Sequence, residues 1–109
     1  MTEIIRYSEL YPGDIGRVYR MKDNISDVEH DRKADIISYL VDGGRPCIMS
    51  TGLSNDVFTG ECTGCPDFVM TDDVYEWGLD YAYYVDKYNL MLPDDFIDHI
   101  LRIVDGKDE

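Results

Sequence analysis

Two runs of apolar residues at helical spacing, both in the last third of the chain, constrain the fold most. From Asp72 to Tyr88, apolar side chains recur every three or four residues, and at about 100° per residue they fall on one helical face. Acidic residues suit the first turn of a helix, and Thr71 or Asp72 is a good N-cap. The pattern predicts a helix over 72–88 whose core face consists of Val74, Trp77, Tyr81, Tyr84, Val85 and Tyr88.

A second helix is predicted to begin at Pro93, because proline suits the first position of a helix. Gly106 is predicted to end it. One face of this helix is apolar and the other is largely acidic. The apolar residues are Phe96, Ile97, Ile100, Leu101, Ile103 and Val104, and the polar ones are Asp94, Asp95, Asp98, Arg102 and Asp105.

Strands are predicted in the earlier part of the chain. Residues 15–21 alternate between apolar and polar side chains, and residues 34–41 are β-branched and aromatic. The sequence DGGRP that follows favours a tight turn, after which residues 47–51 return as the partner strand of a hairpin. The 109 residues fit one domain, 1–109, of the α+β class, with a small antiparallel sheet from the N-terminal half packed against two C-terminal helices.

The chain is strongly acidic, with 23 acidic and 10 basic residues and a net charge of −13. The charge is uneven, because residues 1–50 carry a net −2 and residues 51–109 a net −11. Such a field repels nucleic acid and anionic membranes, and it speeds the encounter with a basic protein. We therefore expect a basic protein partner and no direct contact with nucleic acid or membrane. The alternative is that the acidity serves solubility alone.

Several general features favour a cytoplasmic protein. The chain has no run of 18 apolar residues that would cross a membrane. Its first residues, MTEIIRYSEL, lack the basic region and apolar stretch of a secretory signal. Three cysteines, an odd number, fit reduced thiols better than a disulfide framework.

The segment GECTGCPDF, residues 60–68, contains the one C-x-x-C pair, Cys62 and Cys65. A redox pair normally follows a strand and opens a helix, whereas Pro66 follows this pair directly. We expect a loop with two reduced thiols and no cofactor, and keep the two cysteines as weak metal candidates. A structural zinc site needs four ligands, and a second half-motif is not completed by the other candidates, Cys47, His30 and His99.

Histidines and paired carboxylates give no catalytic signature. His30 lies in a charged connection, and His99 lies at the border of the second helix, with no serine or cysteine near it in sequence. The pairs at 72–73 and 94–95 stand where helix N-termini favour negative charge. Capping therefore explains these pairs better than Ca²⁺ or Mg²⁺ binding, and no calcium-loop motif is present.

Tyrosines mixed with carboxylates characterise the predicted helix 72–88. Tyr75 and Tyr83 fall off its core stripe, among Glu76, Asp80 and Asp86. Aromatic rings supply rigid contact area and carboxylates pair with arginine or lysine, so this mixture is typical of a protein interface. The alternative is that the tyrosines outside the stripe pack beneath the sheet or the second helix.

The segment TDDVYEWGLDYAYYVDKYNLMLPDDFIDHI, residues 71–100, resembles in character the small acidic immunity proteins of bacterial polymorphic and contact-dependent growth inhibition toxins. The resemblance implies a protein without catalysis that binds a cognate toxin domain, often a basic nuclease, and blocks its active site or a nearby exosite. If the two helices pack side by side, the acidic residues of the second extend the surface. The expected partner-binding residues are Asp72, Tyr75, Glu76, Asp80, Tyr83, Asp86, Asp94, Asp95 and Asp98.

Two alternatives belong to other functional classes. A nucleic-acid mimic or anti-restriction inhibitor would use the 17 aspartates as short carboxylates in place of phosphates, although Lys87, Arg102 and many tyrosines interrupt the file of negative charge. A small zinc-binding or redox-linked protein would use Cys62 and Cys65. Metal analysis of protein purified without chelator separates that alternative from the others.

Overall fold

Five strands and three α-helices make up the chain in the computed structural model, which describes residues 2–10 and 17–106. A short 3-10 turn, η1 (Met21–Asp23), follows the second strand. The elements in chain order are β1 (Glu3–Tyr7), β2 (Arg17–Tyr19), α1 (Lys33–Asp42), β3 (Arg45–Asn55), β4 (Cys62–Thr71), β5 (Tyr75–Gly78), α2 (Tyr81–Tyr88) and α3 (Asp94–Val104).

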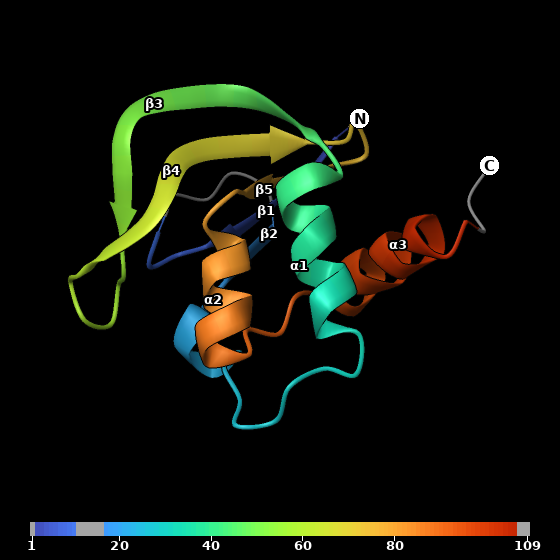
Figure 1. Ribbon diagram of the computed structural model, residues 1–109, viewed down its shortest axis with the longest axis horizontal. Helices are drawn as coiled ribbons and strands as arrows, with labels where there is room; N and C mark the ends of the chain where they lie inside the picture. Colours follow the sequence, from blue (N-terminus) through green and yellow to red (C-terminus); the bar gives the residue numbers. More distant parts are fainter. Residues whose placement is uncertain (1, 11–16, 107–109) are drawn as a thin grey trace.

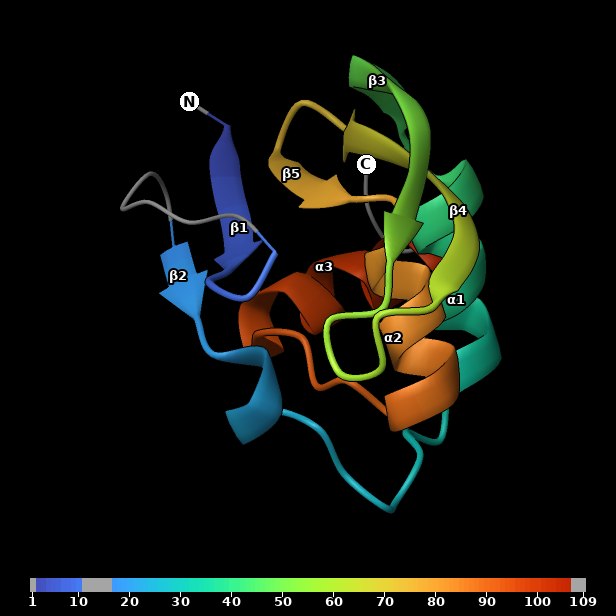
Figure 2. The ribbon, with the colours of Figure 1, turned by 90° about the vertical axis from the view of Figure 1, so that its left-hand side faces the viewer.

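The strands form one mixed sheet in the order β2-β1-β5-β4-β3. Strand β1 runs parallel to both of its neighbours, whereas β4 runs antiparallel to β5 and to β3. The three helices lie on the same side of this sheet (Figures 1 and 2). The predicted α+β class is confirmed. The prediction of a purely antiparallel sheet is wrong, because the first strand and β5 come together in parallel.

The first helix, α1, replaces the strand predicted over 34–41. Its buried residues, Ile36, Tyr39 and Leu40, follow the spacing of one helical face. The β-branched residues in the segment favour a strand only weakly, and burial of this face against the sheet and the other helices overrides that preference. The chain then passes through Gly43 and Gly44 into β3, which confirms the strand predicted over 47–51 but gives it a different partner, β4.

The helix predicted over 72–88 is wrong in its first half and right in its second. Residues 75–78 form β5 between β1 and β4, and the helix α2 begins only at Tyr81. The turn before β5 is built by Asp72, whose carboxylate accepts hydrogen bonds from the backbone N–H groups of Val74 and Tyr75 at 2.9 and 2.8 Å. Tyr75 and Trp77 therefore alternate into the core of a sheet instead of lining a helix.

The cysteine pair lies in a strand and not in a loop. Cys62 begins β4, and Cys65 lies three residues along it. Pro66 is opposite Leu53, at a point where the β3–β4 register shifts. Proline lacks an N–H for the ladder and is tolerated at such an irregularity, which explains how a Gly- and Pro-containing segment can still be a strand. The turn of this hairpin is instead formed by the segment between Asn55 and Cys62.

The second C-terminal helix, α3, is confirmed. Phe96 and Ile100 are fully buried on its core face, and Asp94 and Asp95 lie in its first turn. Gly106 has a φ of +72°, a left-handed conformation that suits glycine just after a helix.

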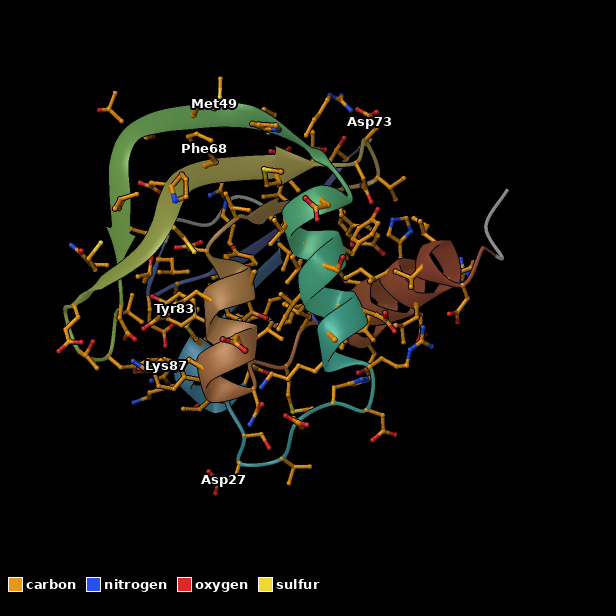
Figure 3. All side chains as sticks on the ribbon, in the orientation of Figure 1. Asp27, Met49, Phe68, Asp73, Tyr83 and Lys87 are labelled. Atoms are coloured by element: carbon orange, nitrogen blue, oxygen red, sulfur yellow. The ribbon has the colours of Figure 1, made fainter. Side chains whose placement is uncertain are left out.

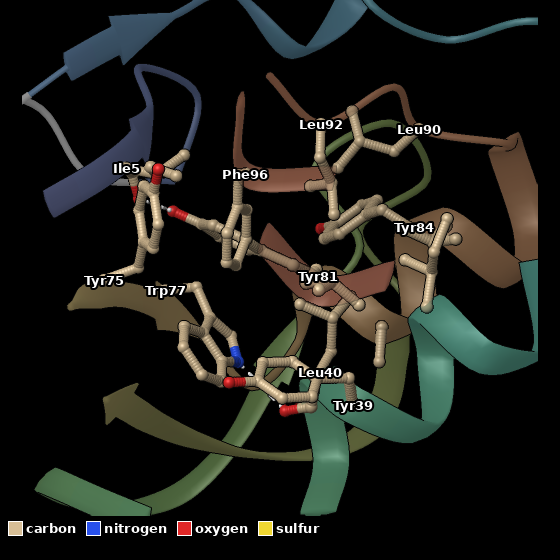
Figure 4. Close-up of a cluster of buried hydrophobic side chains, with 14 of the residues drawn as sticks. Ile5, Tyr39, Leu40, Tyr75, Trp77, Tyr81, Tyr84, Leu90, Leu92 and Phe96 are labelled. Carbon is tan, nitrogen blue, oxygen red and sulfur yellow. Dashed lines mark hydrogen bonds between the residues drawn. The ribbon is translucent and has the colours of Figure 1, made fainter. Parts of the chain in front are cut away.

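Aromatic residues from the sheet and all three helices share one core (Figure 4). Trp77 and Tyr81 form hydrogen bonds inside this core. The indole N–H of Trp77 donates to the Leu40 carbonyl at 2.9 Å, and the hydroxyl of Tyr81 donates to the Ile5 carbonyl at 2.7 Å. These bonds fasten β5 to α1 and α2 to β1. Across the described residues, none of the helices is both long enough and apolar enough to span a bilayer.

Candidate functional site

The predicted partner-binding residues are spread over several elements, so the prediction that those from Asp72 to Asp86 belong to one helix is wrong. The extension of this surface by the second helix depended on the two C-terminal helices packing side by side, whereas α2 and α3 each pack against α1 (Figure 1). Asp72 lies in the β4–β5 turn, Tyr75 and Glu76 in β5, Asp80 just before α2, Tyr83 and Asp86 in α2, and Asp94, Asp95 and Asp98 in α3.

Exposed carboxylates gather on the first turns of α3. Asp94, Asp95 and Asp98 are all exposed there, and we refer to these three residues as the acidic α3 surface. The hydroxyl of Tyr75 donates to Asp95 at 3.3 Å, which ties this surface to β5. The ring of Tyr75 also lies against the imidazole of His99, with a centroid distance of 4.9 Å. The fold thus brings the two acidic segments of the sequence together around one tyrosine and one histidine.

Asp72 anchors the other side of this region. Besides its two backbone bonds, its carboxylate accepts a short hydrogen bond from the Tyr39 hydroxyl and lies 2.7 Å from Nε2 of His99. Burial raises the pKa of this carboxyl, but the bonds from Tyr39, the Tyr75 backbone and His99 outweigh burial and lower it. Asp72 is therefore ionised, and its carboxylate stabilises contacts within the protein. Because that carboxylate is already bonded and largely buried, it presents little charge to a partner.

The Asp72–His99 pair resembles half of a catalytic triad, but the other half is absent from the part of the chain described here. Among those residues, no serine or cysteine side chain is hydrogen-bonded to His99. A nucleophile within hydrogen-bond reach of the base is the feature that such catalysis requires. The contacts of Asp72 with the Tyr75 backbone and with His99 instead position Tyr75 and α3 relative to each other.

Tyr83 takes part in a cluster around Asp56, a residue that the sequence did not single out. Asp56 is 1% exposed and accepts hydrogen bonds from Tyr83 at 2.8 Å and Tyr88 at 2.6 Å. The ammonium of Lys87 lies 3.7 Å from the same carboxylate and beside the Tyr83 ring (Figure 3). The cluster fastens the β3–β4 turn to α2, so the Tyr83 hydroxyl is already engaged within the protein. The only feature of the sequence that indicates this cluster is an aspartate, Asp56, directly before a turn.

The remaining α2 and β5 candidates differ in exposure. Asp86 is exposed on α2, whereas Asp80 is only 2% exposed. Glu76 is half-buried and points away from the core face that holds Tyr75 and Trp77. Its carboxylate instead lies 3.6 Å from the thiol of Cys47. The three residues therefore do not form one surface with the acidic α3 surface.

Cysteines and histidines do not converge. Cys62 is exposed, Cys65 is half-buried, and both have free thiols. His30 is exposed and accepts a hydrogen bond from the Arg32 N–H at 2.9 Å. Over residues 2–10 and 17–106, no three side chains of the His, Cys, Asp or Glu types are arranged to hold a metal ion.

The acidic α3 surface is thus the part of the predicted site that remains exposed and contiguous. The sequence located the three carboxylates of this surface. It did not reveal that Tyr39 and His99 contact Asp72, because neither residue is near Asp72 in sequence. No protein-family model, curated protein or solved structure matches this chain.

Proposed function

We propose that this protein is a non-catalytic binding protein that neutralises a basic protein partner, in the way that an immunity protein neutralises its cognate toxin. The observation that carries the proposal is the acidic α3 surface in a chain with a net charge of −13. A nuclease is the favoured class of partner, because its nucleic-acid site contains the lysines and arginines that such a surface attracts.

The state of the carboxylates supports this proposal. Several acidic residues elsewhere are already paired: Asp73 with Arg45, and Asp105 with Arg32. In contrast, neither Asp94 nor Asp98 has an ion-pair or hydrogen-bond partner for its side chain within the described part of the chain. They are available to the cations of another protein, and loss of one well-desolvated charge pair at an interface costs about 2–5 kcal/mol.

The binding surface is tested by affinity capture from a lysate of the producing cells, with matched variants as bait. One bait carries Asp94→Asn, Asp95→Asn and Asp98→Asn. The control bait carries Asp27→Asn, Asp31→Asn and Asp42→Asn, which remove the same charge from exposed positions elsewhere. We expect one basic protein to remain bound to wild type and to the control bait in high salt, near a one-to-one ratio, and to be lost from the α3 bait.

Inhibition is then measured directly, by adding the purified protein to the captured partner and assaying the partner's activity. Full inhibition at equimolar protein supports the immunity role. Equal loss of the partner from both triple variants would show that net charge, and not the acidic α3 surface, drives binding. Capture of many nucleic-acid-binding proteins that all leave as salt rises would replace the proposal with mimicry of nucleic acid.

A further inference from the structure

A pocket beside the start of α2 contains a buried carboxylate, one oxygen of which has no hydrogen-bond partner among the described residues. The pocket has a volume of about 290 Å³ and lies between the residues after β1, the β3–β4 hairpin and Asp80. Asp80 is 2% exposed, and within the described chain its Oδ1 atom is buried with no hydrogen-bond partner. A buried oxygen of this kind is costly and is normally paired.

Helix capping does not account for Asp80. The residue occupies the N-cap position of α2, but its side chain makes no capping hydrogen bond. Its carboxyl lies instead near Ser54 of β3, which favours the ionised form. Burial, followed by the charge of Asp67 on β4, raises the pKa of Asp80 to about 6. At neutral pH the pocket therefore holds a largely ionised carboxylate, for which the described residues that line the pocket supply no counter-charge.

The other pocket residues define what would complete the site. The carboxylate of Glu9 is occupied, because it accepts hydrogen bonds from the backbone N–H groups of Met21 and Lys22 at 2.7 and 2.9 Å. Asp67 is exposed at the rim. The described residues that line the pocket include two further polar side chains, Ser54 and Asn55, but no lysine or arginine.

From this arrangement we infer that the pocket binds an alkylguanidinium group, with Asp80 as its charge partner and Asp67 as a second carboxylate at the rim. A guanidinium has five N–H donors in a fixed plane, which matches carboxylates together with the oxygen atoms of Ser54 and Asn55. A metal ion is a poorer match, since no group of three potential ligands forms in the described chain. The inference rests on the proposed function only for the source of the group, an arginine side chain of the basic partner.

The test uses the isolated protein and needs no partner. N-acetyl-L-arginine N-methylamide is titrated at pH 7.5 into ¹⁵N-labelled protein, and amide shifts of residues such as Ser54, Asn55 and Asp80 are followed. The matching citrulline derivative is the neutral control ligand. Asp86→Asn is the matched control for Asp80→Asn, because it removes an exposed charge from α2, the helix that Asp80 precedes.

We expect localised shifts with the arginine derivative, and a dissociation constant about tenfold higher in Asp80→Asn but unchanged in Asp86→Asn. Asp67→Asn, an exposed substitution that leaves the core intact, is expected to weaken binding to a smaller extent. Affinity should fall at pH 5, as Asp80 becomes protonated. The other ionisable groups around Asp80 are Glu9, Asp67, Cys65 and Tyr84. The pKa values of Cys65 and Tyr84 are raised, so these two side chains stay neutral between pH 5 and pH 7.5.

The outcomes separate this inference from the proposed function. Absence of localised shifts, equal shifts with the citrulline derivative, or full binding in Asp80→Asn would overturn it, whatever protein the acidic α3 surface captures. Binding of free L-arginine but not of the blocked derivative would overturn the assignment to a side chain and identify a free guanidino compound as the ligand. Binding of the blocked derivative by a protein that captures no partner would support the pocket while the proposed function fails.

Discussion

The hydroxyl of Tyr88 donates a 2.6 Å hydrogen bond to the buried carboxylate of Asp56, joining residues that are 32 apart in the sequence. The same carboxylate accepts hydrogen bonds from the N–H groups of Phe58 and Thr59, which close the β3–β4 turn. Burial alone would raise the pKa of Asp56, but the bonds from Tyr88, Tyr83 and the turn overcome it and lower the pKa to about 2. One charged group therefore stabilises both the turn and its attachment to α2.

Removing the Tyr88 hydroxyl tests this linkage. Tyr88→Phe is expected to lower the free energy of unfolding by about 1.5–3 kcal/mol, because it deletes a hydrogen bond to a buried charge. Lys87→Met, which removes a partly exposed ion pair at 3.7 Å, should cost less than about 1 kcal/mol. Urea unfolding at pH 7 measures both. Equal effects of the two substitutions would show that the hydrogen bond is not the main support.

The pH dependence of stability follows from the lowered pKa of Asp56. Because the folded state holds the ionised form more tightly than the unfolded state, this stabilisation is present above about pH 4 and is lost as the pH falls towards 2. The difference in unfolding free energy between wild type and Tyr88→Phe should therefore shrink over that range. Urea titrations at pH 7, 4 and 2.5 measure the change, and a constant difference would contradict the assignment.

Asp80 should give the free energy of unfolding a pH dependence opposite to that of Asp56. Its pKa is raised to about 6, so its protonated form is favoured by folding, and the associated stability is present below about pH 4 and lost as pH rises through 6. Asp80→Asn is expected to stabilise the protein at pH 7 by on the order of 2 kcal/mol and to flatten this dependence. Thermal unfolding from pH 4 to pH 8 measures it, with Asp86→Asn as the exposed control. A destabilised variant at pH 7 would contradict the prediction.

Gly44 is confined by its neighbours at the junction of α1 and β3. A Cβ atom at this position would lie 2.6 Å from the backbone oxygen of Thr71 and 2.9 Å from the Trp77 ring. Since the nearest atom belongs to the backbone of β4, Gly44→Ala is expected to cost about 1–3 kcal/mol of stability. Ser38→Ala, at an exposed position on α1, should change it by less than about 0.5 kcal/mol. Chemical denaturation of the two variants compares them.

The surroundings of Cys47 raise the pKa of its thiol. Partial burial raises its pKa, and the neighbouring carboxylate of Glu76 raises it further. Glu76→Gln should therefore increase the thiolate fraction and speed alkylation of Cys47 by iodoacetamide at pH 7 about threefold. Peptide mass spectrometry resolves the three cysteines, and the rate at Cys62 in the same variant is the internal control. An unchanged rate at Cys47 would mean that Glu76 does not control its ionisation.

The sequence by itself was sufficient for α3, for the α+β class and for the location of the acidic surface. In α3 the apolar residues from Phe96 onwards, the acidic first turn and Gly106 all indicate the same helix, so local and tertiary preferences agree. The exposed carboxylates of the acidic α3 surface follow from that helix alone, because its apolar face must turn towards the core.

Only the tertiary structure decided the segment from Asp72 to Tyr88 and the identity of α1. Apolar residues at 74, 77, 81, 84, 85 and 88 satisfy a helical period, yet Tyr75 and Trp77 alternate equally well in a strand, and the place between β1 and β4 selects the strand. Likewise, the side chains that hydrogen-bond Asp56 and Asp72 are 27 to 33 residues away, and Asp80 is buried by elements distant in sequence. Local spacing cannot specify such pairings, because they depend on which elements meet when the whole core is buried.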